Sequence, residues 1–88
     1  MRVKVAFSPQ GWDDYVGWSQ DKRTRAKIDA LIGSMMREPF GGLGHPEPLR
    51  GWLTNTWSRK IDEKNRIVYR VRDGEVEVVQ CRGHYDDH

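Results

Sequence analysis

Three widely separated side chains are the first candidates for chemistry in this sequence: Glu47, Arg66 and His84. Glu47 lies between two prolines, which hold the backbone extended and would fix its carboxylate in space. His84 directly follows Gly83, and a glycine can turn the chain and redirect the next side chain. Carboxylate and imidazole groups exchange protons, and a guanidinium binds anions. An ordinary acidic loop residue would also fit at position 47, and His45 and His88 are competing histidines.

Positive charge is concentrated in the second half of the chain. The whole chain carries a formal charge of +2, but the segment from Arg50 to Arg72 has an excess of +5 and the remainder sums to −3. Such asymmetry indicates a surface for a polyanion, although a solvated strand surface with salt-bridged arginines gives the same pattern. The basic residues of this segment are Arg50, Arg59, Lys60, Lys64, Arg66, Arg70 and Arg72, and its acidic residues are Asp62 and Glu63.

The turn at Asp73-Gly74 predicts which side chains face each other across a hairpin. Asp-Gly between alternating runs favours a two-residue type I′ loop. The resulting register would pair Arg72 with Glu75, Arg70 with Glu77, Val68 with Val79, and Arg66 with Cys81. Arg66 would then be the arginine of this strand without an acidic neighbour, so we expect its guanidinium to be available to a ligand.

A second turn, over residues 63–65, predicts the neighbouring register. A three-residue loop would pair Asp62 with Arg66, Lys60 with Val68, Ser58 with Arg70, Ile61 with Ile67, and Trp57 with Val71. The large apolar residues then share one face, and Ser58, Lys60 and Arg66 share the other. Asp62 could instead neutralise Arg66 in a structural ion pair, and the sequence leaves both possibilities open.

The elements that must position these residues follow from periodicity and caps. Residues 2–7 alternate as a strand that ends at Ser8, and Ser8-Pro9 then begins a short helix that includes Val16. Asp21 caps a second helix, which ends near Arg37 before Pro39 and a glycine-rich loop. Its apolar stripe consists of Ile28, Leu31, Ile32, Met35 and Met36.

The rest of the chain is predicted to be a long loop and three strands. Residues 43–56 are expected to be irregular, and strands are expected over Trp57–Asp62, Arg66–Arg72 and Glu75–Arg82. The order β-α-α-β-β-β predicts one α+β domain over residues 1–88, with a mainly antiparallel sheet. Both helices would cover one face of the sheet and leave the other face open.

Composition excludes several other classes of protein. Cys81 is the only cysteine, so no intramolecular disulfide can form, and we expect a reducing, cytoplasmic location. No apolar run approaches the roughly 20 residues that span a bilayer, so no membrane partner is expected. The histidines and the cysteine lack metal-ligand spacing, and no glycine-rich phosphate loop joins a strand to a helix. We therefore expect no metal and no cofactor.

A set of short motifs occurs along the chain in a fixed order. They are Trp12-Asp13-Asp14-Tyr15, Asp21-Lys22-Arg23, Glu38-Pro39-Phe40, Pro46-Glu47-Pro48-Leu49, Trp57-Ser58-Arg59, Arg66-Ile67-Val68-Tyr69 and, on either side of position 83, Cys81-Arg82 and His84-Tyr85. Together they resemble the Txe/YoeB toxins of the RelE superfamily, from Met1 to Tyr85. The resemblance implies a RelE-like fold and a toxin of a type II toxin-antitoxin system.

This resemblance also implies an activity, a ribosome-dependent mRNA endonuclease that cuts in the A site without a metal. Glu47 would be the general base for the ribose 2′-hydroxyl, Arg66 would stabilise charge on the phosphate, and His84 would protonate the leaving oxygen. The products would be a 2′,3′-cyclic phosphate and a 5′-hydroxyl. The residues expected to contact RNA are Arg50, Arg59, Lys60 and Tyr85. Family members usually carry a second arginine where this chain has Lys60, which leaves only a point charge there.

The implied partners are mRNA and the ribosome, a YefM-like antitoxin whose flexible tail folds onto the toxin, and a second copy in a possible homodimer. An alternative is a non-catalytic RNA- or ribosome-binding inhibitor of translation on the same fold. A gyrase-directed toxin on this fold is disfavoured, because it would not need Glu47, Arg66 and His84.

Overall fold

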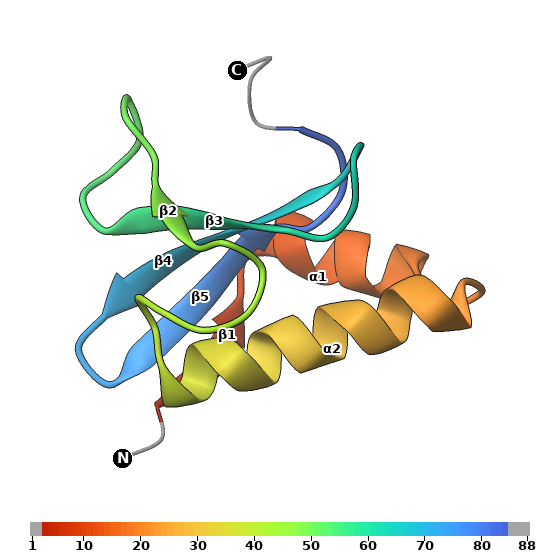
Figure 1. The fold of residues 1–88 in the computed structure, drawn as a ribbon, viewed down its shortest axis with the longest axis horizontal. Coiled ribbons are helices and arrows are strands. Elements are labelled where there is room, and N and C mark those ends of the chain that lie inside the picture. Colours follow the sequence, from red (N-terminus) through yellow and green to blue (C-terminus); the bar gives the residue numbers. More distant parts are fainter. Residues whose placement is uncertain (1–2, 85–88) are drawn as a thin grey trace.

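The computed structural model describes residues 3–84. The elements are β1 (Lys4–Phe7), α1 (Pro9–Gly17), α2 (Lys22–Arg37), β2 (Glu47–Pro48), β3 (Thr56–Lys60), β4 (Arg66–Arg72) and β5 (Glu75–Gln80) (Figure 1). The strands form one sheet in the order β1-β5-β4-β3-β2, in which only the β1–β5 pair is parallel. The predicted α+β class and the mainly antiparallel sheet are confirmed.

Both helices begin at the caps that the sequence predicts. The Ser8 hydroxyl accepts a hydrogen bond from the Gly11 N–H, and the Asp21 carboxylate accepts one from the Thr24 N–H. These caps satisfy amide groups that have no partner within the helix. α2 ends at Arg37, as expected from Pro39. Among residues 3–84, no helix is long and apolar enough to cross a membrane.

The core lies between the helices and one face of the sheet. The buried stripe of α2 packs against alternate residues of β4 and β5, and Val5 and Phe7 of β1 lie at its edge. α1 approaches β5 closely at Gly11, where a Cβ would lie 2.2 Å from the Val78 carbonyl oxygen. The Cys81 thiol is also buried there, and burial, followed by the nearby Asp14 carboxylate, raises its pKa to about 12.

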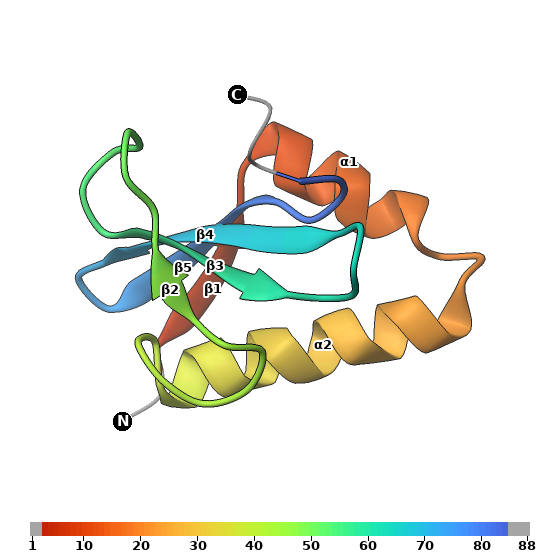
Figure 2. The same cartoon turned by 45° about the horizontal axis from the view of Figure 1, so that its top comes forward.

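The opposite face of the sheet is less open than predicted. Figure 2 shows α2 along one side of the sheet, whereas the loop between β2 and β3 extends to the other side. On that other side Ser58 and Val68 are 1% and 0% exposed, although neither belongs to the helix-side core. Ser58 and Val68, in the middle of this face, are therefore buried, and charged side chains lie around them.

The segment before β3 is also more ordered than predicted. Glu47 and Pro48 form the short strand β2, antiparallel to β3, with Glu47 opposite Ser58. The prediction that residues 43–56 are wholly irregular is therefore wrong. Proline is tolerated here because β2 is an edge strand, which needs hydrogen bonds on only one side.

Two predicted registers are corrected. β3 and β4 are joined by the five residues 61–65, so Lys60 lies opposite Arg66 and Trp57 lies opposite Tyr69. This shift of two residues preserves the predicted faces, because side chains alternate with a period of two. In the β4–β5 hairpin, Arg72–Glu75 and Arg70–Glu77 pair as predicted.

A register shift between Val68 and Tyr69 then changes the β4–β5 pairing. Val68 lies opposite Gln80, and Tyr69 lies opposite Val78, so Val79 is the extra residue of a β-bulge. The predicted Val68–Val79 and Arg66–Cys81 pairs are therefore wrong. Because the bulge reverses the alternation, Cys81 enters the helix-side core and Gln80 moves to the opposite face.

Candidate functional site

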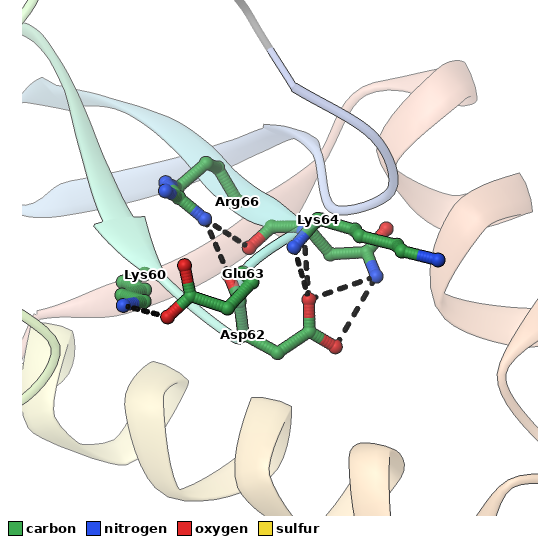
Figure 3. A network of polar contacts seen from close by, with 6 residues as sticks. Lys60, Asp62, Glu63, Lys64 and Arg66 are labelled. Carbon is green, nitrogen blue, oxygen red and sulfur yellow. Dashed lines mark hydrogen bonds and ion pairs between the residues drawn. The ribbon is translucent and has the colours of Figure 1, made fainter.

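Arg66 begins β4 on the face opposite the helices. Its Nη1 donates hydrogen bonds to the backbone carbonyls of Asp62 and Asn65 (Figure 3). Within residues 3–84 no carboxylate lies within ion-pair distance of this guanidinium. The remaining donors of Arg66 are therefore not engaged by an acidic side chain of the described chain, as the sequence predicted.

The Asp62 carboxylate serves the loop and does not pair with Arg66. It accepts hydrogen bonds from the backbone amides of Lys64 and Asn65, both at 2.8 Å, and from the Asn65 side chain. Burial alone would raise the pKa of Asp62, but these hydrogen bonds outweigh it and lower the pKa below its usual 3.8. The alternative of a structural Asp62–Arg66 ion pair is thus excluded in this structure.

The segment that carries His84 lies directly beside Arg66. Gly83 has a φ of +80°, which confirms the predicted bend at this glycine. Its carbonyl accepts a hydrogen bond of 2.9 Å from the Arg66 N–H, and its N–H donates one of 2.8 Å to Asn65 Oδ1. His84 is half-buried and follows this doubly anchored residue.

Glu47 shares a face of the sheet with Arg66. It lies opposite Ser58, which lies opposite Val68, and Arg66 is two residues from Val68 along β4. Directly opposed and alternate residues project from the same side of a sheet. The exposed Glu47 carboxylate is thus separated from the Arg66 strand by two strand spacings of about 4.8 Å each, on the face where Ser58 and Val68 are buried.

The residues predicted to contact RNA lie in different surroundings. Lys60 is opposite Arg66 and half-exposed, and its ammonium forms a 2.8 Å ion pair with Glu63. Arg50 is exposed in the loop after β2. Tyr85 lies outside the described residues. Lys60 and Arg50 remain candidates, whereas the placement of Arg59 does not support RNA contact.

Arg59 is 0% exposed and projects toward the helices. Its guanidinium donates to the carbonyls of Glu38, Pro39 and Leu43, to the Ser34 hydroxyl and to the Tyr69 hydroxyl. A buried arginine requires such partners, because an unsatisfied buried charge is strongly destabilising. The prediction that Arg59 binds RNA is therefore wrong, and this side chain joins β3 to the end of α2 and to the loop that follows.

The basic excess of the sequence is also partly neutralised. Arg70 and Arg72 both form ion pairs with Glu77, at 3.1 and 3.2 Å. Because Arg59 is buried and Lys60 is paired with Glu63, much of the positive charge that was predicted to bind a polyanion interacts with groups of the protein itself. A pocket of about 370 Å³ lies between α2 and the loop at Leu43–His45, and only Lys60 of the candidate residues borders it.

Asn65 is a site residue that our sequence prediction missed. It connects the Asp62 carboxylate, the Arg66 guanidinium and the Gly83 backbone. The signal was present, because Asp62 followed by Asn65 before a strand is typical of a turn closed by side-chain hydrogen bonds. In residues 3–84, no three His, Cys, Asp or Glu side chains group in a way that could hold a metal ion.

Comparisons with known proteins identify the family. Residues 7–85 match the model of the YoeB-like toxin of bacterial type II toxin-antitoxin systems. Toxin YoeB of Mycobacterium bovis is 46% identical over 82 residues, which cover 92% of this chain and 96% of that protein. The YoeB dimer of Staphylococcus aureus superimposes with a TM-score of 0.87 at 38% identity, covering 97% and 100% of the two chains.

A second solved structure, the heterotetrameric YoeB-YefM toxin-antitoxin complex of Staphylococcus aureus, gives a TM-score of 0.84. It too is 38% identical, and the match covers 97% of this chain and 100% of that chain. The family match, the near-complete coverage and the shared fold agree. The chain therefore belongs to the family of YoeB-like toxins of bacterial type II toxin-antitoxin systems.

Proposed function

We propose that this chain is a ribosome-dependent mRNA endonuclease that cleaves RNA by attack of a ribose 2′-hydroxyl on the adjacent phosphate. The observation that carries the proposal is the hydrogen bond from the Arg66 N–H to the Gly83 carbonyl, which holds the segment of His84 beside Arg66. Glu47 lies on the same face of the sheet as Arg66. Membership of the YoeB-like toxin family supports it.

In the proposed reaction each residue has one task. The Glu47 carboxylate takes the proton of the 2′-hydroxyl, and the 2′-oxygen forms a bond to phosphorus. The bond from phosphorus to the 5′-oxygen breaks, and the His84 imidazolium donates a proton to that oxygen. The Arg66 guanidinium stabilises the additional negative charge on the phosphate while these bonds change. The products are a 2′,3′-cyclic phosphate and a 5′-hydroxyl.

Replacing these residues tests the proposal. Glu47→Gln and His84→Gln should each lower the single-turnover cleavage rate by about a hundredfold or more, since positioned acids and bases contribute on that scale. Arg66→Ala should reduce cleavage as well. The measurement is mapping of 5′-hydroxyl ends on ribosome-bound mRNA, together with growth arrest after induction. Full toxicity in all three variants would exclude this mechanism.

The non-catalytic alternative makes a different prediction. An inhibitor that blocks the ribosome through charge would arrest translation without new mRNA ends, and its binding would weaken steeply with salt. The internal pairing of Arg59, Arg70 and Arg72 leaves less surface charge for such binding, so we favour the endonuclease.

A YefM-like antitoxin is the proposed protein partner, and a homodimer is the proposed assembly of the free toxin. The Staphylococcus aureus complex and dimer support these proposals for this chain. Co-expression with a YefM-like antitoxin should give a stable complex on size-exclusion chromatography and restore growth. A toxin that remains alone and lethal under co-expression would contradict the antitoxin assignment.

A further inference from the structure

The loop between β3 and β4 contacts both Arg66 and the segment of His84 through one residue, Asn65: its backbone carbonyl binds the Arg66 guanidinium, and its side chain binds the Gly83 N–H. Asn65 Oδ1 accepts the Gly83 N–H at 2.8 Å, and Asn65 Nδ2 donates to the Asp62 carboxylate at 3.1 and 3.3 Å. An asparagine amide has one acceptor and one donor end, and here each is used. The orientation of the side chain is thereby fixed.

The backbone of Asn65 contributes to the same arrangement. Its carbonyl accepts hydrogen bonds from Arg66 Nη1 at 3.1 Å and from the Ile61 N–H at 3.1 Å. Figure 3 shows the Arg66 guanidinium turned back toward the carbonyls of this loop, and the Asp62 carboxylate directed to the amides on its other side. The loop therefore fixes the direction of the guanidinium as well as its own shape.

Gly83 is the residue through which the loop reaches His84. The C=O and N–H of Gly83 are both bound, by the Arg66 amide and by Asn65 Oδ1, and its positive φ favours glycine. Without the second bond, Gly83 itself would keep only the hydrogen bond between its carbonyl and the Arg66 amide. A displacement of about 1 Å can cost roughly a hundredfold in rate when groups must be aligned.

We propose that Asn65 is a positioning residue that holds His84 in place, relative to Arg66, for protonation of the leaving 5′-oxygen. This inference rests on the proposed endonuclease function. Asn65 does not touch the substrate; it acts through the backbone of Gly83. Its loss should therefore affect the step that needs the proton from His84 and leave ribosome binding unchanged.

A substrate with sulfur in place of the bridging 5′-oxygen separates this role from a general loss of structure. A thiolate leaves without protonation, so cleavage of such a linkage does not require a general acid. Ribosomes programmed with mRNA containing either linkage in the A-site codon should be treated with wild type, Asn65→Ala and His84→Gln. On the oxygen substrate, Asn65→Ala should lose about tenfold to a hundredfold in single-turnover rate with unchanged affinity for the ribosome.

On the sulfur substrate, the rates of Asn65→Ala and His84→Gln should both return close to that of wild type. The control is Asp73→Asn in the turn between β4 and β5, at the other end of β4. This variant should behave as wild type on both substrates. Equal rates for wild type and Asn65→Ala on the oxygen substrate would overturn the inference. Loss on both substrates would also overturn it, because an effect on folding or on Arg66 would explain that result.

The same experiment distinguishes failure of the proposed endonuclease function from failure of the proposed role of Asn65. If wild type releases no cyclic phosphate from either substrate, the endonuclease proposal itself is wrong. If wild type cleaves and His84→Gln is rescued by sulfur but Asn65→Ala is not, the function stands and only the role of Asn65 is rejected.

Discussion

Asp62 shows how one carboxylate can stabilise a loop mainly through hydrogen bonds. Its oxygens accept hydrogen bonds from the amides of Lys64 and Asn65 and from the Asn65 side chain. These bonds favour the charged form, so the pKa of Asp62 lies below its usual 3.8 even though burial alone would raise it. At the residue scale, a carboxylate that the sequence left as a possible partner of Arg66 is instead part of the turn that positions Arg66.

This lowered pKa predicts a dependence of stability on pH. A carboxyl with a lower pKa in the folded state stabilises the protein at pH values above 3.8, and that contribution is lost as the pH falls below it. Between pH 6 and about pH 3, the melting temperature of the wild type should therefore fall more steeply than that of Asp62→Asn. Parallel pH profiles for the two proteins would contradict this assignment.

At the scale of elements, two helical glycines have opposite surroundings. A Cβ at Gly11 of α1 would lie 2.2 Å from the Val78 carbonyl oxygen of β5, whereas one at Gly33 of α2 would meet only the end of the Arg37 side chain at 3.5 Å. Gly33→Ala should stabilise the protein by up to about 1 kcal/mol, because alanine favours helix. Gly11→Ala should destabilise it by about 1–3 kcal/mol, because α1 must move away from β5. Chemical denaturation of both variants measures the difference, and stabilisation by Gly11→Ala would contradict this packing.

The elements themselves were largely predictable, and their registers were less so. Caps at Ser8 and Asp21 are local signals, and both helices follow them. The bulge at Val79 reverses the alternation of β5, and only the spacing of Val76, Val78 and Cys81 indicates it in the sequence. The strand β2 consists of two residues, too few to show an alternating pattern, so its pairing with β3 could not be predicted from the sequence.

At the scale of the whole molecule, Arg59 connects parts that the sequence separates. From the sequence we expected it to contact RNA, and a fully buried arginine is rare. Its donors instead bind the Ser34 hydroxyl, the carbonyls of residues 38, 39 and 43, and the Tyr69 hydroxyl. The carboxyl-terminal end of α2 lies there, where the helix dipole favours a cation.

Replacing Arg59 should greatly lower the free energy of unfolding. Arg59→Met would leave several buried acceptors without donors, and we expect a loss of at least about 3 kcal/mol in the free energy of unfolding. Lys60→Met, the matched control at the next position, removes only a partly exposed ion pair with Glu63 and should change stability by less than about 1 kcal/mol. Denaturant unfolding of the two variants compares them directly, and similar losses would refute the internal role of Arg59.

The parallel pairing of β1 with β5 joins the beginning of the chain to its end. Lys4 is paired with Glu75, so closing this contact must overcome the entropy of a loop that contains most of the protein. A growing polypeptide cannot complete the sheet until its last strand has been synthesised. Since Gly83 and His84 follow β5, the proposed reaction centre of a nascent chain can form only after every strand of the sheet has been synthesised.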